Sequence, residues 1–369
     1  MPNGLRKEDS SALKGLAVLM MIFHHCYRLA ERIEKYQVDL CGLSTGQVVA
    51  VAESFKICVA LFAFVSGYGL MYGYSGKKEG RKDNRMISGW ISGHILSTMS
   101  GYWFTAVTFY LAAFGLKCVN FGRFGETFEE KVFAVIADIL GIAKLMGTES
   151  LNGAWWYMSA ALVFIILLPL LDSMIGKFGG IFCILLVFIF PRVTKMGFPG
   201  GSRPYSFLMI FVIGMLCCKY NFFRKFHECK WKKLKFMSLV ILLCAGFFLY
   251  HKINIKVFWE FRYVAVPFLV IVFCVEYLFR FLPLSVFLQY LGRHSMNIWL
   301  VHTFVRDWLG EYIFAFKNIW LIPLVVLVIS LGISYCLDFM KWISGYEKLI
   351  KRIQNRLNRY YERQENAGR

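Results

Sequence analysis

Residues 13–25 read Leu-Lys-Gly-Leu-Ala-Val-Leu-Met-Met-Ile-Phe-His-His, an apolar helical pattern that starts beside a cation and ends on two histidines. Lys14 and His25 are eleven positions apart. In a helix that is three turns plus about 20°, so both side chains lie on one face, roughly 16 Å apart, whereas His24 points about 80° away. Ionisable side chains within a membrane helix face the protein interior and mark functional sites by default. The stretch therefore predicts a polar seam that enters a lipid bilayer.

The composition of the whole chain agrees with a membrane protein. Of its 369 residues 58% are hydrophobic, 36 are Phe, and only 18% are charged. A soluble domain carries about 25% charged residues. Apolar runs long enough to cross about 30 Å of hydrocarbon recur along the whole length. We therefore expect several membrane-spanning helices.

We predict an all-α, polytopic integral membrane protein with about ten transmembrane helices. The candidate spans are residues 12–29, 48–74, 94–115, 153–172, 179–196, 205–219, 236–251, 257–281, 294–314 and 318–340. They form one membrane domain, residues 1–340, followed by a basic amphipathic tail, residues 341–369. The tail places Tyr346, Leu349, Ile350, Ile353, Leu357 and Tyr360 at helical spacing between basic residues, a pattern typical of a helix that contacts anionic lipid.

Basic residues indicate the orientation. Lysines and arginines crowd the segments 75–93, 219–235 and 341–369, and ten spans put all three on the side of the N-terminus. The positive-inside rule makes that side the cytosol of a multi-pass protein, which we expect in the plasma membrane. Because these basic residues flank spans, the net charge of +19 does not indicate nucleic-acid binding.

One further apolar segment does not fit the count. Residues 132–147 contain Asp138 and Lys144. Counting the segment as a span would put the basic segments on opposite sides of the bilayer. We therefore interpret it as a short helix on the outer face.

A second candidate site lies in the span 294–314. Ser295, Trp299, His302 and Arg306 recur at i, i+4, i+7 and i+11, which is one helix stripe. An imidazole in such a stripe can simply bond to a neighbouring carbonyl and lock helices together. Two histidine seams in one chain make the functional interpretation stronger, because each desolvated imidazole destabilises the fold unless it has a partner.

Two shorter motifs have structural explanations of their own. Ser66 and Tyr68 lie in Phe-Val-Ser-Gly-Tyr, where small residues let a neighbouring helix approach closely. Trp156 belongs to the run Trp-Trp-Tyr at the start of the span 153–172, where an aromatic belt is expected. The sequence contains no nucleophile elbow, phosphate-binding loop, dinucleotide fingerprint or zinc-protease motif, and we predict no bound metal or cofactor.

In this order, the motifs resemble the acyltransferase 3 family of integral membrane acyltransferases, which includes bacterial O-acetyltransferases of surface glycans. The motifs are Leu-Lys-Gly-Leu-Ala…His-His, Phe-Val-Ser-Gly-Tyr, Trp-Trp-Tyr-Met-Ser and Gly-Arg-His-Ser-Met-Asn-Ile-Trp-Leu-Val-His. The resemblance covers residues 10–340. It implies ten spans, a cytosolic N-terminus, acyl-CoA as the donor and a saccharide hydroxyl as the acceptor.

The resemblance also assigns residues. The family's first span has an Arg followed eleven positions later by a His, and Lys14 and His25 occupy those places. His302 matches the His that ends the Tyr-Leu-x-His pattern. Lys in place of Arg keeps the charge but loses the bidentate fork. The family's Arg-x-x-Arg falls on His94 and Ser97, so Arg85 or nearby lysines would have to serve the donor phosphates.

We therefore expect an acyltransferase, and more specifically an O-acetyltransferase, that acts from acyl-CoA on a hydroxyl of a surface or lipid-linked glycan. His25 is the expected base, because imidazole titrates near working pH. His302 is expected as a second proton carrier or an orienting group, and Lys14 and Arg85 as donor contacts. A transporter or flippase with a histidine-lined pathway is the alternative, since ten spans and a polar seam suit a substrate route as well.

Overall fold

The structure is a computed structural model, and it describes residues 4–78, 84–194, 203–252 and 259–366. In that part of the chain every regular element is helical, and the one β-bridge, between Asp39 and Asn318, is isolated. The α-helices are α1 (Lys7–Tyr27), α2 (Ala30–Lys35), α3 (Thr45–Ser54), α4 (Cys58–Lys78), α5 (Asn84–Gly115), α6 (Phe128–Ile139), α7 (Ala143–Met146), α8 (Trp156–Phe178), α9 (Gly180–Val193), α10 (Leu208–Lys219), α11 (Phe222–Glu228), α12 (Lys232–Tyr250), α13 (Val266–Glu276), α14 (Leu282–Arg293), α15 (Ser295–Trp308), α16 (Gly310–Phe314), α17 (Leu321–Ile343) and α18 (Tyr346–Asn366). Short helices of other types join several of them: the 3-10 helices η1 (Phe55–Ile57), η2 (Phe121–Phe124), η3 (Gly153–Trp155) and η5 (Leu278–Arg280), and the π-helix η4 (Phe261–Ala265).

The prediction of apolar helices of membrane length is confirmed for part of the chain. Among the described residues five helical segments are long and apolar enough to cross a bilayer: Thr45–Gly76, Gly153–Phe178, Lys232–Tyr250, Phe261–Arg280 and Leu321–Ile343. All ten predicted spans overlap helices, but α9 and α10 have 14 and 12 residues, which is only about 18–21 Å. α1, α5 and α15 are helical but are not among the five apolar segments, and α1 and α15 carry the buried histidines and other polar residues. The count of ten is therefore not established by helix length and hydropathy.

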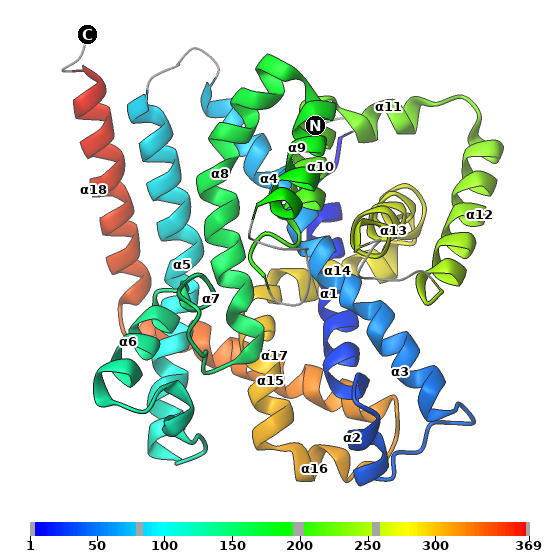
Figure 1. Ribbon diagram of the computed structural model, residues 1–369, viewed down its shortest axis with the longest axis vertical. Coiled ribbons are helices and arrows are strands. Elements are labelled where there is room, and N and C mark those ends of the chain that lie inside the picture. Colours follow the sequence, from blue (N-terminus) through cyan, green and yellow to red (C-terminus); the bar gives the residue numbers. More distant parts are fainter. Residues whose placement is uncertain (1–3, 79–83, 195–202, 253–258, 367–369) are drawn as a thin grey trace.

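α1 runs through the interior and organises the packing. It contacts α14, α4, α3, α15 and α17, so the helix quoted first from the sequence touches elements from both halves of the chain. Figure 1 shows α5 and α18 along one edge and α12 along the opposite edge. α11 and the end of α18 lie at the top of that view, and α2 and α16 lie at the bottom. The apolar core of buried side chains surrounds α1 and α4.

Glycines set the two closest helix contacts. A Cβ added to Gly15 of α1 would lie 2.0 Å from the backbone oxygen of Leu288 in α14, and one added to Gly67 of α4 would lie 2.1 Å from that of Phe211 in α10. On the facing helix, a Cβ added to Gly214 of α10 would lie 2.4 Å from the backbone oxygen of Phe64 in α4. Small residues at a helix interface let the backbones approach closely. The prediction that the Ser-Gly segment of the second span admits a neighbouring helix is thus confirmed.

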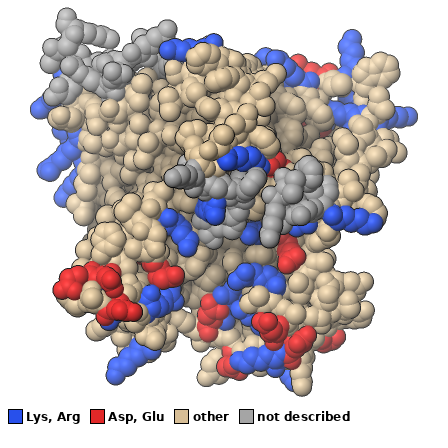
Figure 2. Space-filling view, viewed as in Figure 1, with Lys and Arg blue, Asp and Glu red and all other residues tan. Residues whose placement is uncertain are grey.

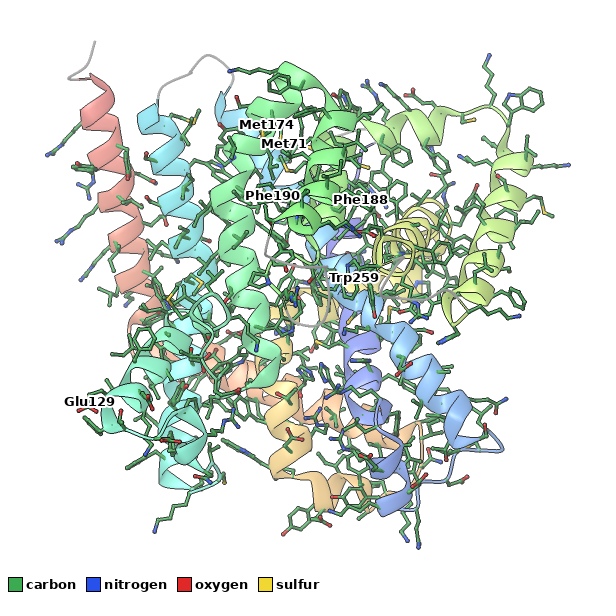
Figure 3. The ribbon with its side chains drawn as sticks, viewed as in Figure 1. Met71, Glu129, Met174, Phe188, Phe190 and Trp259 are labelled. Atoms are coloured by element: carbon green, nitrogen blue, oxygen red, sulfur yellow. The ribbon has the colours of Figure 1, made fainter. Side chains whose placement is uncertain are left out.

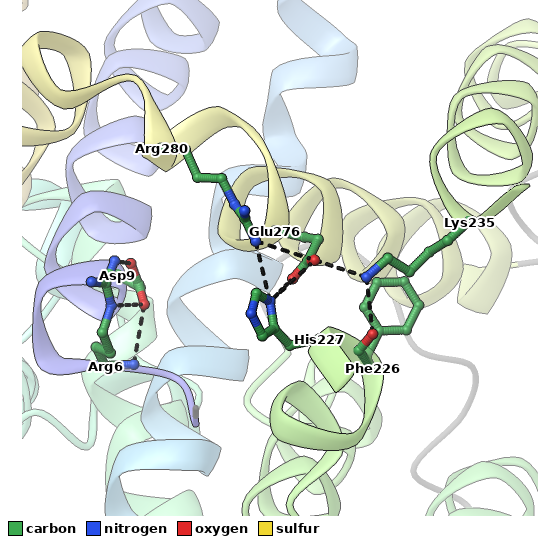
Figure 4. A network of polar contacts seen from close by, with 7 residues as sticks. All are labelled: Arg6, Asp9, Phe226, His227, Lys235, Glu276 and Arg280. Carbon is green, nitrogen blue, oxygen red and sulfur yellow. Dashed lines mark hydrogen bonds and ion pairs between the residues drawn. The ribbon is translucent and has the colours of Figure 1, made fainter. Parts of the chain in front are cut away.

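A buried carboxylate holds α12 against the rest of the protein (Figure 4). Glu276 of α13 contacts Lys235 of α12 at 2.8 Å, His227 of α11 at 3.2 Å and Arg280 at 3.3 Å. Lys235 Nζ also donates to Phe226 O at 3.0 Å. Two cations and an imidazole contact this carboxylate at once, and such pairing is the condition under which a buried charge is tolerated.

The segment 132–147 forms two helices rather than one. α6 ends at Ile139, Gly141 has φ +74°, and α7 follows. α6 has 12 residues and is therefore about 18 Å long, too short to span. Asp138 at its end accepts hydrogen bonds from Tyr110 Oη (2.8 Å), Ser150 Oγ (2.6 Å) and Leu151 N (2.7 Å). Burial raises the pKa of Asp138, and these donors oppose that shift.

The basic tail is helical as predicted, and one of its faces is covered by protein. Tyr346 Oη of α18 donates to Ser100 O of α5 at 2.8 Å, and Tyr361 Oη lies 3.2 Å from Ser92 Oγ. Leu349, Ile353 and Tyr360 remain exposed beside that contact. α18 therefore packs along α5 and keeps a second apolar stripe free.

Candidate active site

One cavity joins most of the predicted site residues. Its volume is about 820 Å³, and α1, α4, α5, α8 and α15 contribute to its wall. Seven residues singled out from the sequence line it: Lys14, His25, Ser66, Trp156, Ser295, Trp299 and Arg306. The face of α1 that carries Lys14 and His25 and the face of α15 that carries Ser295 and Arg306 therefore line the same cavity.

The two key histidines meet although 277 positions separate them in the chain. The ring centroids of His25 and His302 are 4.9 Å apart. His25 lines the cavity, whereas His302 is buried behind it. The pair is therefore one unit, with His25 exposed to any substrate and His302 supporting it.

The hydrogen bond of His302 selects its tautomer. Nδ1 of His302 lies 2.8 Å from the backbone oxygen of Trp299, which can only accept, so Nδ1 carries the proton. Nε2 of neutral His302 then presents a lone pair. It is buried and has no hydrogen-bond partner among the described residues. A buried lone pair beside His25 is able to accept a hydrogen bond from the His25 ring.

His24 also lines the cavity, but its ring is engaged in packing. Its Nδ1 lies 2.7 Å from Ala52 O in α3, which makes it a donor to that carbonyl. The bond ties α1 to α3. His24 thus bonds a carbonyl, as the structural interpretation of such histidines expects, and so does His302 through Trp299 O. The ring of His25 makes no such bond within the described residues.

Two arginines anchor the end of α1. Arg32 Nη1 and Arg306 Nη1 donate to the backbone oxygen of His25, at 2.6 Å and 3.2 Å. Arg306 is also paired with Asp307, at 2.7 Å and 2.6 Å. Arg306 therefore fixes α15 to the last turn of α1, which sets the spacing between the two histidines.

A shared carbonyl fixes the start of α8. Asn152 Nδ2 and Trp155 Nε1 both donate to Leu300 O of α15, at 3.1 Å and 3.0 Å. These bonds hold the start of α8, and with it Trp156, beside the histidine stripe. The tryptophan-rich motif therefore positions the cavity wall.

Two predicted site residues lie elsewhere. Tyr68 does not line the cavity, and its hydroxyl accepts a hydrogen bond from Leu5 N at 3.2 Å. Arg85 belongs to the backbone of α5, but its side chain lies outside the described residues.

The sequence analysis missed three cations of the cavity wall, Arg28, Lys56 and Arg123. Lys56 lies within the predicted span 48–74, so the rule that singled out Lys14 could have found it. Arg28 and Arg123 lie at a helix end and in a connection, where a basic residue gives no sequence signal of its own. Among the described residues, no group of His, Cys, Asp and Glu could hold a metal ion.

Comparison with known proteins identifies a family. The sequence model described as an acyltransferase domain, acyltransferase 3, matches residues 9–339, nearly the whole chain. No curated protein and no solved structure matches it. The match favours acyl transfer over the transporter alternative.

Proposed function

Since this chain belongs to the acyltransferase 3 family, we propose that it moves an acetyl group from acyl-CoA to a hydroxyl of a cell-surface or lipid-linked glycan. The observation that carries the proposal is the His25–His302 pair, 4.9 Å apart beside a cavity that also reaches Lys14. Acyl transfer to a hydroxyl needs a base at the acceptor oxygen and room for both substrates. The cavity offers both.

Acyl transfer from the thioester to the hydroxyl needs no reactant besides the two substrates. The acceptor oxygen attacks the thioester carbonyl carbon, so that a C–O bond forms and the C–S bond breaks. His25 takes the hydroxyl proton, which leaves with the CoA thiolate as the thiol. His302, held as the Nδ1–H tautomer by Trp299 O, supports the imidazolium that forms on His25.

The topology follows the same proposal. Ten spans with both termini in the cytosol of a plasma-membrane protein would deliver acyl-CoA from the side of Lys14 and the glycan from the side of Arg28. Residues 1–340 are then the catalytic membrane domain and 341–369 its cytosolic tail. Cysteine labelling at Lys232 tests the orientation, since access from outside the cell would contradict it.

Glycan analysis tests the proposed activity. Cells with and without the protein are compared for ester-linked acetyl groups on their surface glycans, and purified protein is assayed for transfer from radiolabelled acetyl-CoA. We expect the acetyl esters to disappear with the protein. Unchanged acetylation together with no transfer in vitro would contradict the proposal.

The donor contact is tested at Lys14. The phosphates of acyl-CoA require cationic partners, and a charge-assisted hydrogen bond contributes about 1.5–3 kcal/mol. We expect Lys14→Ala to raise the KM for acyl-CoA about tenfold or more, and Lys14→Arg to retain the wild-type value. Lys7→Ala is the matched control, an exposed lysine of the same helix outside the cavity. A wild-type KM in Lys14→Ala would remove Lys14 from the donor site.

A further inference from the structure

The cavity wall carries an excess of positive charge. Its described lining includes five cations, Lys14, Arg28, Lys56, Arg123 and Arg306, and one carboxylate, Asp307. Asp307 is already engaged by Arg306. Figure 2 shows the lower half of the molecule hollowed between two lobes, with both basic and acidic side chains beside the hollow. Glu129 on α6 points outward at the edge of the protein (Figure 3), away from the interior.

Of the five cations, only Arg306 forms an ion pair within the described part of the chain. Arg28 follows α1 and Lys56 lies in η1, and neither forms an ion pair there. Lys56 is half-buried, with Nζ 5.9 Å from the centre of the Tyr263 ring. The charges of Arg28 and Lys56 repel each other, and both also act on His24. Arg28 is exposed, so solvent screens part of this repulsion, and Glu53 offsets part of it at Lys56. An anionic ligand beside Arg28 and Lys56 would be attracted by both cations.

This pair is separate from the proposed donor contact. Arg28 lies fourteen positions after Lys14, which is about 21 Å along the helix, and only three positions after His25, which is about 4.5 Å. A ligand anion at Arg28 and Lys56 is therefore next to the base and far from Lys14. The sugar that receives the acyl group would itself carry, or adjoin, the negative charge.

We propose that the acceptor is an anionic saccharide whose carboxylate or phosphate is bound by Arg28 and Lys56 while its neighbouring hydroxyl faces His25. The proposal rests on the acyltransferase function proposed above and specifies the substrate class. The bound anion neutralises the two cations and fixes the orientation of the sugar. One hydroxyl of the sugar then lies nearest His25 and is acylated.

The test identifies the charge on the product. Membranes from cells that lack the gene supply native acceptors, and purified protein with radiolabelled acetyl-CoA supplies the label. Labelled saccharide is released from any lipid carrier and applied to an anion exchanger at pH 7. We expect it to bind. Release from the resin after phosphatase treatment identifies a phosphate, and release after carboxyl reduction identifies a carboxylate; labelled saccharide that is neutral from the outset overturns the proposal.

Charge variants test the residues. We expect Arg28→Gln and Lys56→Gln each to raise the KM for the acceptor about tenfold or more, with the KM for acetyl-CoA unchanged. Lys56→Arg should retain most of the affinity. Lys35→Gln is the control, an exposed cation at the same end of the molecule that does not line the cavity.

The outcomes separate this inference from the proposed function. Wild-type acceptor KM values in both Gln variants, or a raised KM for acetyl-CoA instead, overturn the anion site while transfer itself persists. Absence of any labelled product from wild-type protein contradicts the acyltransferase proposal. Thermal unfolding of each variant identifies any that have lost the fold, and Lys56→Arg then provides the remaining comparison.

Discussion

Replacing His25 with alanine should reduce acyl transfer at least about 100-fold, the loss typical of a general base. His25 is the histidine that both lines the cavity and packs against His302, at 4.9 Å. The measurement is initial-rate transfer from acetyl-CoA by purified protein in lipid nanodiscs, with thermal unfolding recorded alongside. His25→Gln serves as a second variant that keeps more of the side-chain volume.

His24 supplies the matched control within the same helix turn. Its Nδ1 is held by Ala52 O, so we expect His24→Ala to lower stability while substantial transfer remains. His302→Ala should fall between the two or match His25→Ala, because it removes the partner of the base. An inactive His24→Ala beside an active His25→Ala would show that the helical register of α1 is misassigned. Full activity in both would make the imidazoles packing residues.

Gly67→Ala should be the most destabilising small substitution in α4. The added Cβ would meet the backbone oxygen and carbon of Phe211 at 2.1 Å and 2.9 Å, so α4 and α10 would have to separate. Forcing a methyl group into a closely packed site costs about 1–3 kcal/mol, and more where the obstructing atoms belong to a backbone. The helix contact that it disturbs also carries Ser66 of the cavity wall.

Gly69→Ala is the control, two residues away in the same helix. An added Cβ there meets nothing within 4 Å, and alanine is the better helix former by about 1 kcal/mol. We expect unchanged or slightly higher thermal stability for Gly69→Ala and a clear loss for Gly67→Ala. Equal melting temperatures of the two variants in nanodiscs would contradict the close approach of α4 and α10.

Local periodicity made several features readable from the chain alone. The face shared by Lys14 and His25, the stripe from Ser295 to Arg306 and the close packing at Gly67 all depend on the helix angle of about 100° per residue and on side-chain size. The all-helical class follows from apolar runs of membrane length. The structure agrees in each case, because a helix is specified by its own residues and its hydrogen bonds close within four positions.

What only the tertiary structure decided is which faces meet. Nothing local brings His302 beside His25 across 277 positions, or Lys56 into the same cavity as Arg28. Close approaches at Gly15, Gly67, Gly214 and Gly292 set how the helices cross, and the bonds from Arg32 and Arg306 to His25 O fix the end of α1. Such contacts join residues far apart in the chain, and their geometry depends on every helix packing at once. Periodicity defines a face of each helix, but only packing chooses the partner of that face.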